Sequence, residues 1–160
     1  MRKRFELQHE LGARPIEEAR FPKGKYRDSL TKALLALQHI YLTPELNTKV
    51  FDLLEERVCG HLARTGRPGM SLWEILVLGV VRMVEDVDYD RLLHIANCDM
   101  LVRDIMGLKT AWDEHPKVYS YQSIKDNIGW LDEETLEAIN ALVVSEGHRL
   151  KKKRRTRRSY

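Results

Sequence analysis

Residues 72–84 constrain the fold most, because they are apolar on nearly every side of a helix. Ser71, just before this stretch, and Glu74, in its first turn, form a capping box, a pair of residues that is typical of the start of a helix. A helix that is apolar all round must be buried among other elements. The stretch is too short to span a bilayer, and it contains the charged residues Glu74 and Arg82. The sequence therefore predicts one central, buried helix.

The remaining sequence predicts further amphipathic helices. Apolar residues recur at helical spacing in residues 28–42, 43–58, 88–97, 99–107, 120–129 and 132–147. The predicted N-terminal caps are Asp28 or Ser29, Thr43, Asp88, Asp99, Ser120 and Asp132. Residues 109–117 resemble a polar loop, and no segment shows the two-residue alternation that is typical of strands. We therefore predict an all-α fold, a compact helical domain.

Composition divides the chain into three parts. Residues 1–26 mix charged residues with two glycines and two prolines and show no sustained period, which predicts a flexible N-terminal arm. Residues 27–150 contain the helical patterns and form the predicted domain. Residues 151–160 form a basic C-terminal tail, because they contain seven cations and no acidic residue.

The basic tail dominates the charge of the chain. Lys and Arg number 27 against 24 Asp and Glu, so removing the seven tail cations leaves 20 against 24 in residues 1–150, a net charge of −4. If all seven cations met phosphates, the logarithm of the affinity would fall with the logarithm of salt concentration at a slope of roughly −6. The predicted DNA contacts here are Lys151, Lys152, Lys153, Arg154, Arg155, Arg157 and Arg158. The alternative is a solvated tail whose affinity for nucleic acid is incidental.

Residues 120–128 form a short helix whose apolar edge is Tyr121, Ile124 and Ile128. The rest of its surface is polar, and Gln and Asn can pair with adenine edges while Ser and Lys suit phosphates or guanine. Because it follows two capped helices, we predict the recognition helix of a helix-turn-helix-like module. The predicted DNA contacts of this helix are Ser120, Gln122, Ser123, Lys125 and Asn127. A further predicted contact is Arg67, in the turn-rich break of residues 65–69 before the central helix. The alternative is an ordinary amphipathic helix with a solvated face.

Other patterns of reactive residues give no catalytic or metal site. The acidic residues between positions 85 and 90 could hold Mg²⁺, but Asp88 is needed as a cap and Asp90 suits the first helical turn. The six histidines form no paired ligand motif, and Cys59 and His61 are a two-ligand fragment without a partner pair. We therefore predict no catalytic residues, no metal ligands and no cofactor.

Six short pieces of the sequence are informative through their order and spacing along the chain. They are Met1-Arg-Lys-Arg-Phe5, Thr43-Pro-Glu-Leu-Asn47, Gly66-Arg-Pro-Gly-Met-Ser71, Asp88-Tyr-Asp-Arg-Leu92, Tyr121-Gln-Ser-Ile-Lys-Asp-Asn-Ile128 and Glu146-Gly-His-Arg-Leu-Lys-Lys152. Together they resemble the N-terminal DNA-binding region of bacterial insertion-sequence transposases of the ISNCY type, in the DDE superfamily. The resemblance covers most of residues 1–152 and implies that the helical body recognises the terminal inverted repeats of a mobile element.

The resemblance also implies where strand transfer takes place. Such transposases use two Asp and one Glu in a ribonuclease-H-like domain to bind two Mg²⁺ ions. That domain would begin after Lys153, where this chain reads Arg154-Arg-Thr-Arg-Arg-Ser-Tyr160. We therefore expect a truncated transposase that is not an enzyme, with Mg²⁺ belonging only to the missing domain. A frameshifted or prematurely stopped gene, a piece cut at a domain boundary and a deliberately short inhibitory product stay open as origins.

The expected partners and location follow from these interpretations. Double-stranded DNA is the expected partner, with a second copy or a full-length transposase as a further one. No membrane partner is expected, because no secretory signal follows the basic N-terminus. Two lone cysteines fit a reducing compartment, so the expected location is the bacterial cytoplasm at the nucleoid. The alternative function is a helical protein–protein interaction module for transposase self-association or inhibition, since the body is net acidic.

Overall fold

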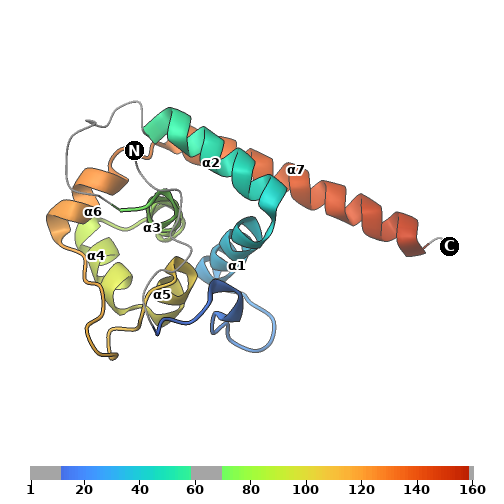
Figure 1. Ribbon diagram of the computed structural model, residues 1–160. Coiled ribbons are helices and arrows are strands. Elements are labelled where there is room, and N and C mark those ends of the chain that lie inside the picture. The colour runs from blue at the N-terminus through green and yellow to red at the C-terminus, as the bar shows by residue number, and fades with distance from the viewer. Residues whose placement is uncertain (1–11, 59–69, 159–160) are drawn as a thin grey trace.

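The computed structural model describes residues 12–58 and 70–158, and the side chains of residues 12–57 and 70–145. Within these ranges the chain forms seven α-helices and one short 3₁₀ helix, η1, and no strand (Figure 1). The elements are η1 (Ile16–Glu18), α1 (Ser29–Leu42), α2 (Pro44–Val58), α3 (Leu72–Glu85), α4 (Tyr89–Cys98), α5 (Met100–Met106), α6 (Tyr121–Ile128) and α7 (Glu133–Arg158). The predicted all-α class is confirmed.

Helix α3 is the buried centre of the fold. Its residues 72–79 are all buried, and α1, α2, α4, α5 and α6 contact it. The fully buried Trp73 donates a hydrogen bond from its indole Nε1 to the Ile105 carbonyl at 2.7 Å. The rings of Tyr41 and Phe51 pack against the same indole, with centroids 5.1 and 6.4 Å away. The predicted central helix is confirmed.

Polar side chains begin most of the helices, as the sequence predicts. The capping side chains are those of Asp28, Ser71, Asp88, Asp99, Ser120 and Asp132, and each accepts a hydrogen bond from the backbone N–H three residues later. These bonds satisfy N–H groups that have no partner inside the helix. The hydroxyl of Thr31 also donates to Asp28, and this bond holds the pKa of that carboxyl below its ordinary value.

Gly79 of α3 allows the turn between α6 and α7 to pack close against this helix. A Cβ added there would lie 2.2 Å from Cδ2 of Leu131, which is buried in the turn between α6 and α7. A glycine inside a helix costs about 1 kcal/mol relative to alanine, a cost that close packing against a neighbouring helix would explain. The close neighbour is instead the residue that leads from α6 into α7.

Part of the segment predicted to be a flexible arm is docked on the helices. Ile16 is 3% exposed, its carbonyl accepts a hydrogen bond from Gln38 Nε2, and η1 contacts α1 and α5. Arg20 forms two side-chain hydrogen bonds with Asp104, both at 2.9 Å. These bonds raise the pKa of the Arg20 guanidinium above its ordinary value. A few apolar residues, Ile16, Ala19 and Phe21, and one ion pair between distant residues produce no helical period, so the sequence gives no sign of this docking.

Helix α7 continues beyond its predicted end. The sequence predicts a stop at Gly147 and a separate tail from residue 151, but the helix includes Gly147 and runs to Arg158. An interior glycine costs a helix only about 1 kcal/mol relative to alanine, and the Lys and Arg residues after it are good helix formers. The first part of α7 packs antiparallel to α2, and its second part extends past the other helices (Figure 1). No helix in the described ranges combines the length and the apolar character needed to cross a membrane.

We predict that the effect of Gly79→Ala on stability changes sign with the residue at position 131. In the natural background the added Cβ displaces the buried Leu131 side chain, so we expect a loss of about 1–2 kcal/mol in the free energy of unfolding. In a Leu131→Ala background the clash is absent, and the better helix propensity of alanine should make the same change neutral or stabilising by up to about 1 kcal/mol. Urea unfolding of the four proteins measures this coupling. Equal effects in both backgrounds would contradict the close approach.

Candidate nucleic-acid interface

The strongest concentration of positive charge lies on the extended part of α7. Residues 151–158 are helical and contain seven Lys and Arg. Eight helical residues rise about 12 Å, so the segment holds about one positive charge per 1.7 Å of axis. Duplex DNA has about one negative charge per 1.7 Å of its own axis. The segment therefore matches the charge density of a nucleic-acid backbone.

The outer face of α6 is polar but not uniformly suited to DNA. Gln122, Lys125 and Asp126 are exposed, while Ile124 and Ile128 are buried. Gln122 donates a hydrogen bond from its amide to Asp126 at 2.6 Å. This bond engages one of the donors predicted to read bases. Asp126 also adds a negative charge to the face predicted to meet phosphates.

Asn127 does not lie on the exposed face where the sequence predicts it. It is 8% exposed and donates a hydrogen bond to the Ser123 carbonyl at 2.7 Å. It comes three residues after Ile124 and one before Ile128, so it shares their buried side of the helix. The exposed position predicted for Asn127 is therefore wrong, because its amide is held within the protein, and base reading by this residue stays a prediction.

The other predicted DNA contacts on α6 and before it differ in their exposure. Ser120 is exposed, but its hydroxyl accepts the Ser123 backbone N–H as the helix cap, and Ser123 itself is half-buried. Tyr121, predicted on the apolar edge, is 40% exposed. Arg67 lies outside the described residues. Of the DNA contacts predicted within α6, Gln122 and Lys125 are thus the exposed ones.

The helix order around α6 differs from a tight helix-turn-helix. Helices α4 and α5 are joined through Asp99 alone, which ends one helix and caps the next. Helix α6 packs against α3 and α4, but the connection from α5 to α6 spans residues 107–120. A DNA-binding helix-turn-helix has a turn of about three to four residues. The helix-turn-helix-like module therefore stays a prediction.

This long connection is fixed in place by a buried arginine. Arg103 is fully buried, and its guanidinium donates to the carbonyls of Ala96 at 2.9 Å, Lys117 at 2.7 Å and Lys109. Two of these carbonyls belong to the connection itself. The arginine therefore holds the first part of the connection, at Lys109, and its second part, at Lys117, to each other and to α4.

A buried carboxylate holds the second arm of the connection to α3. Glu74 is 4% exposed and accepts hydrogen bonds from Lys117 Nζ at 3.0 Å and from the Tyr119 hydroxyl at 2.7 Å. Asn97 of α4 exchanges two hydrogen bonds with the backbone of Tyr119, at 3.1 and 2.8 Å. Side chains from α3, α4 and α5 together fix the path of the loop.

Trp112 is the functional candidate that sequence reasoning missed. The sequence predicts only a polar loop over residues 109–117, yet Trp112 within it is 94% exposed, and Val118 just after it is 69% exposed. Large aromatic residues held on a fixed loop are typical contact residues in interfaces. The signal that could have identified it is a tryptophan inside an otherwise polar stretch.

One of the acidic residues considered as a Mg²⁺ ligand has a structural role. Asp88 accepts the Arg91 backbone N–H at 2.8 Å, which is the cap predicted for it. In the parts of the chain that the structure describes, no three His, Cys, Asp or Glu side chains are grouped so that they could hold a metal ion.

Comparisons of this chain with models of protein families, with curated proteins and with solved structures find no match.

We predict that Arg103→Met loosens the whole connection. Three buried carbonyls lose their donor, so the free energy of unfolding should fall by about 3 kcal/mol. Hydrogen exchange at the amides of residues 109–119 should become faster than in the natural protein. The matched control is Lys125→Met, which removes an exposed cation and should change stability by less than about 0.5 kcal/mol. Equal stability of the two variants would contradict this role.

Proposed function

We propose that this chain is a DNA-binding module, the recognition part of a transposase of the type it resembles, and that it binds the ends of a mobile element. The observation that supports this most is the helical placement of residues 151–158, which extends seven cations beyond the bundle. A helix keeps these charges at a regular spacing, so fewer conformations are lost on binding than for a free tail. The proposed partner is double-stranded DNA of the bacterial nucleoid.

The proposed mechanism separates affinity from specificity. The cationic end of α7 contacts phosphates, which contributes affinity without sequence information. Sequence is read by the exposed face of α6, where Gln122 and Lys125 reach base edges or nearby phosphates. For Gln122 to do so, its hydrogen bond to Asp126 must be exchanged for one to a base. The proposed activity is binding, and strand transfer is not attributed to these residues.

The salt dependence of binding tests the role of the cationic helix. The natural protein should bind a duplex at low salt, with a slope of log affinity against log salt of roughly −6. A variant in which Lys151, Lys152 and Lys153 become Gln keeps good helix formers. Its slope should be less steep by roughly 3, because three phosphate contacts are lost. The control variant changes three exposed lysines elsewhere, Lys23, Lys25 and Lys32, to Gln and should keep the natural slope. Fluorescence anisotropy of a labelled duplex measures all three, and no binding at low salt overturns the proposal.

Sequence preference tests the role of α6. Duplexes selected from a random library should bind the natural protein more tightly than scrambled versions of the same composition. Gln122→Ala should reduce this preference by about 1–2 kcal/mol, because a direct contact to a base is lost. Lys125→Gln should instead weaken binding to selected and scrambled duplexes alike, because a phosphate contact carries no sequence information. The control is Ser145→Ala, a change at an exposed position of α7. Equal affinity of the natural protein for selected and scrambled duplexes removes base reading and leaves non-specific binding alone.

A further inference from the structure

Charge reverses sharply along α7. Residues 133–146 contain four Glu and no Lys or Arg, whereas residues 149–158 contain eight Lys and Arg and no acid. The dipole of a helix favours such a bias only within its first and last turns. Helix α7 has 26 residues, so most of this segregation lies outside those turns. The bias therefore calls for an explanation beyond the helix itself.

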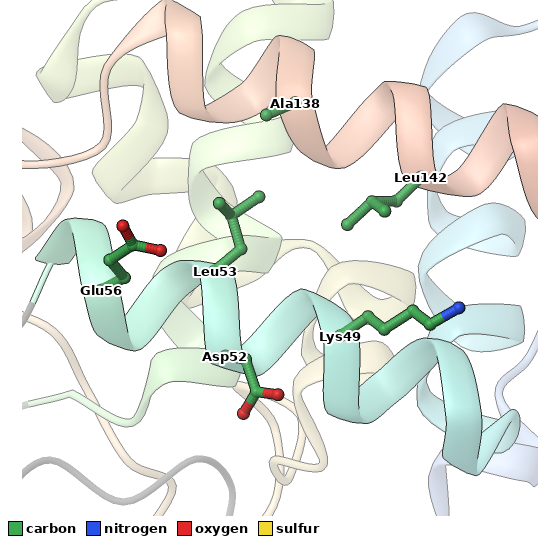
Figure 2. A pocket seen from close by; sticks show the side chains of 6 residues that line it. All are labelled: Lys49, Asp52, Leu53, Glu56, Ala138 and Leu142. Atoms are coloured by element: carbon green, nitrogen blue, oxygen red, sulfur yellow. The ribbon is translucent and has the colours of Figure 1, made fainter.

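The acidic part of α7 forms one wall of an open groove. The other wall is α2, and the groove has a volume of about 420 Å³ (Figure 2). Leu53, Ala138 and Leu142 give it an apolar lining, and two acids, Asp52 and Glu56, and one cation, Lys49, lie along its α2 side. Residues 44–57 contain four acids and two bases, and residues 133–145 contain three Glu and no base. The groove is thus apolar inside, its charged lining has a net charge of −1, and residues 44–57 and 133–145 of the two helices that form it total −5.

Two further apolar residues in the described part of α7 are exposed outside the groove lining. Ala141 is exposed, and Val144 is 49% exposed. Exposed apolar residues beside a charged rim are typical of a surface that another helix covers. A fitting occupant is a helix with alkyl stems and positive charge, because Lys and Arg side chains cover apolar surface with their stems and present their charges to acids.

We propose that two copies of this chain pair through their α7 helices, antiparallel, so that residues 149–158 of each copy lie on the α2–α7 groove of the other. Charge complementarity selects this orientation, because a parallel pair would set acids against acids and cations against cations. Each half of an antiparallel pair instead joins an acidic to a cationic part. The contact is the same on both copies, as a two-fold symmetric dimer requires.

Gly147 lies at the centre of this pairing. The α7 wall of the groove is centred near residue 140 and the cationic segment near residue 153, and residue 147 is midway between them. Two helices related by a two-fold axis come closest where they cross, and a glycine allows the closest approach. The interior glycine that α7 tolerates thus has a place in the proposed dimer.

Sedimentation velocity of the full chain without DNA tests the pairing. The natural protein should shift from monomer to dimer as its concentration rises, and the dimer should weaken between low and high salt. Neutralising the groove with Asp52→Asn and Glu56→Gln should weaken dimerisation by about tenfold. The matched control, Glu85→Gln with Glu114→Gln, removes two exposed acids elsewhere and should dimerise like the natural protein. A monomer at every concentration, or equal weakening in both variants, overturns the proposal.

Disulfide trapping tests the orientation. Both natural cysteines are first changed to Ser, and a copy with Ala138→Cys is mixed with a copy with Thr156→Cys. Each position is nine residues from Gly147, so the antiparallel pair places them opposite each other, whereas a parallel pair separates them by about 27 Å. A cross-link between unlike copies is expected, and cross-links between like copies alone overturn the orientation.

The pairing uses the same cationic segment as the proposed function but does not depend on DNA binding, and the two can fail separately. A monomer that still binds DNA with the expected salt slope overturns the pairing and leaves the proposed function standing. A dimer without affinity for DNA does the reverse.

Discussion

The burial of α3 on all sides determines where the rest of the chain can lie. A helix that is apolar all round leaves no side free, so five other helices contact it. Two of its buried polar side chains are satisfied from neighbouring elements, Trp73 by a carbonyl of α5 and Glu74 by the connection between α5 and α6. The buried Nε of Arg82 has no hydrogen-bond partner among the residues that the structure describes. Gly79 is the place where this covering comes closest. The surface left for function lies on the elements that cover α3 incompletely or not at all: the outer face of α6, the loop of residues 107–120 and the extension of α7.

Two buried charged side chains, Arg103 and Glu74, fix the path of the loop of residues 107–120. Removing one partner of a buried charged network costs far more than the network contributes, because the remaining charge is left without compensation. Arg103 has carbonyls as its partners, so its positive charge is spread over backbone dipoles at three positions. Long connections without secondary structure are uncommon in compact domains unless they have a function. The exposed Trp112 on this fixed loop gives the connection the features of a contact surface that either proposed partner could use.

The sequence predicts best the features that depend on neighbours within a few residues. The caps at Asp28, Ser71 and Asp132 and the all-round apolar pattern of α3 are local, and the structure confirms them. The docking of the N-terminal segment depends on Arg20 meeting Asp104, 84 positions away, and no local rule links the two. The end predicted for α7 at Gly147 is wrong for another reason: an interior glycine costs a helix only about 1 kcal/mol, and the Lys and Arg residues after it are good helix formers. The polarity of Asn127 suggests an exposed position, although its spacing from Ile124 puts it on the buried side, and here periodicity is the better guide.

The two proposals meet on one segment, and charge decides between them. Residues 149–158 can face the acidic groove of a second copy or the phosphates of a duplex, but not both at once. The described residues of α2 and α7 have a net charge of −5, of which the groove lining contributes −1, whereas a duplex offers about one charge per 1.7 Å over its whole length and releases counterions on binding. The duplex is therefore the stronger competitor at low salt, and by mass action it draws the pair apart. The proposed dimer then keeps the cations covered until DNA is present, which gives the charge reversal along α7 a use in both states.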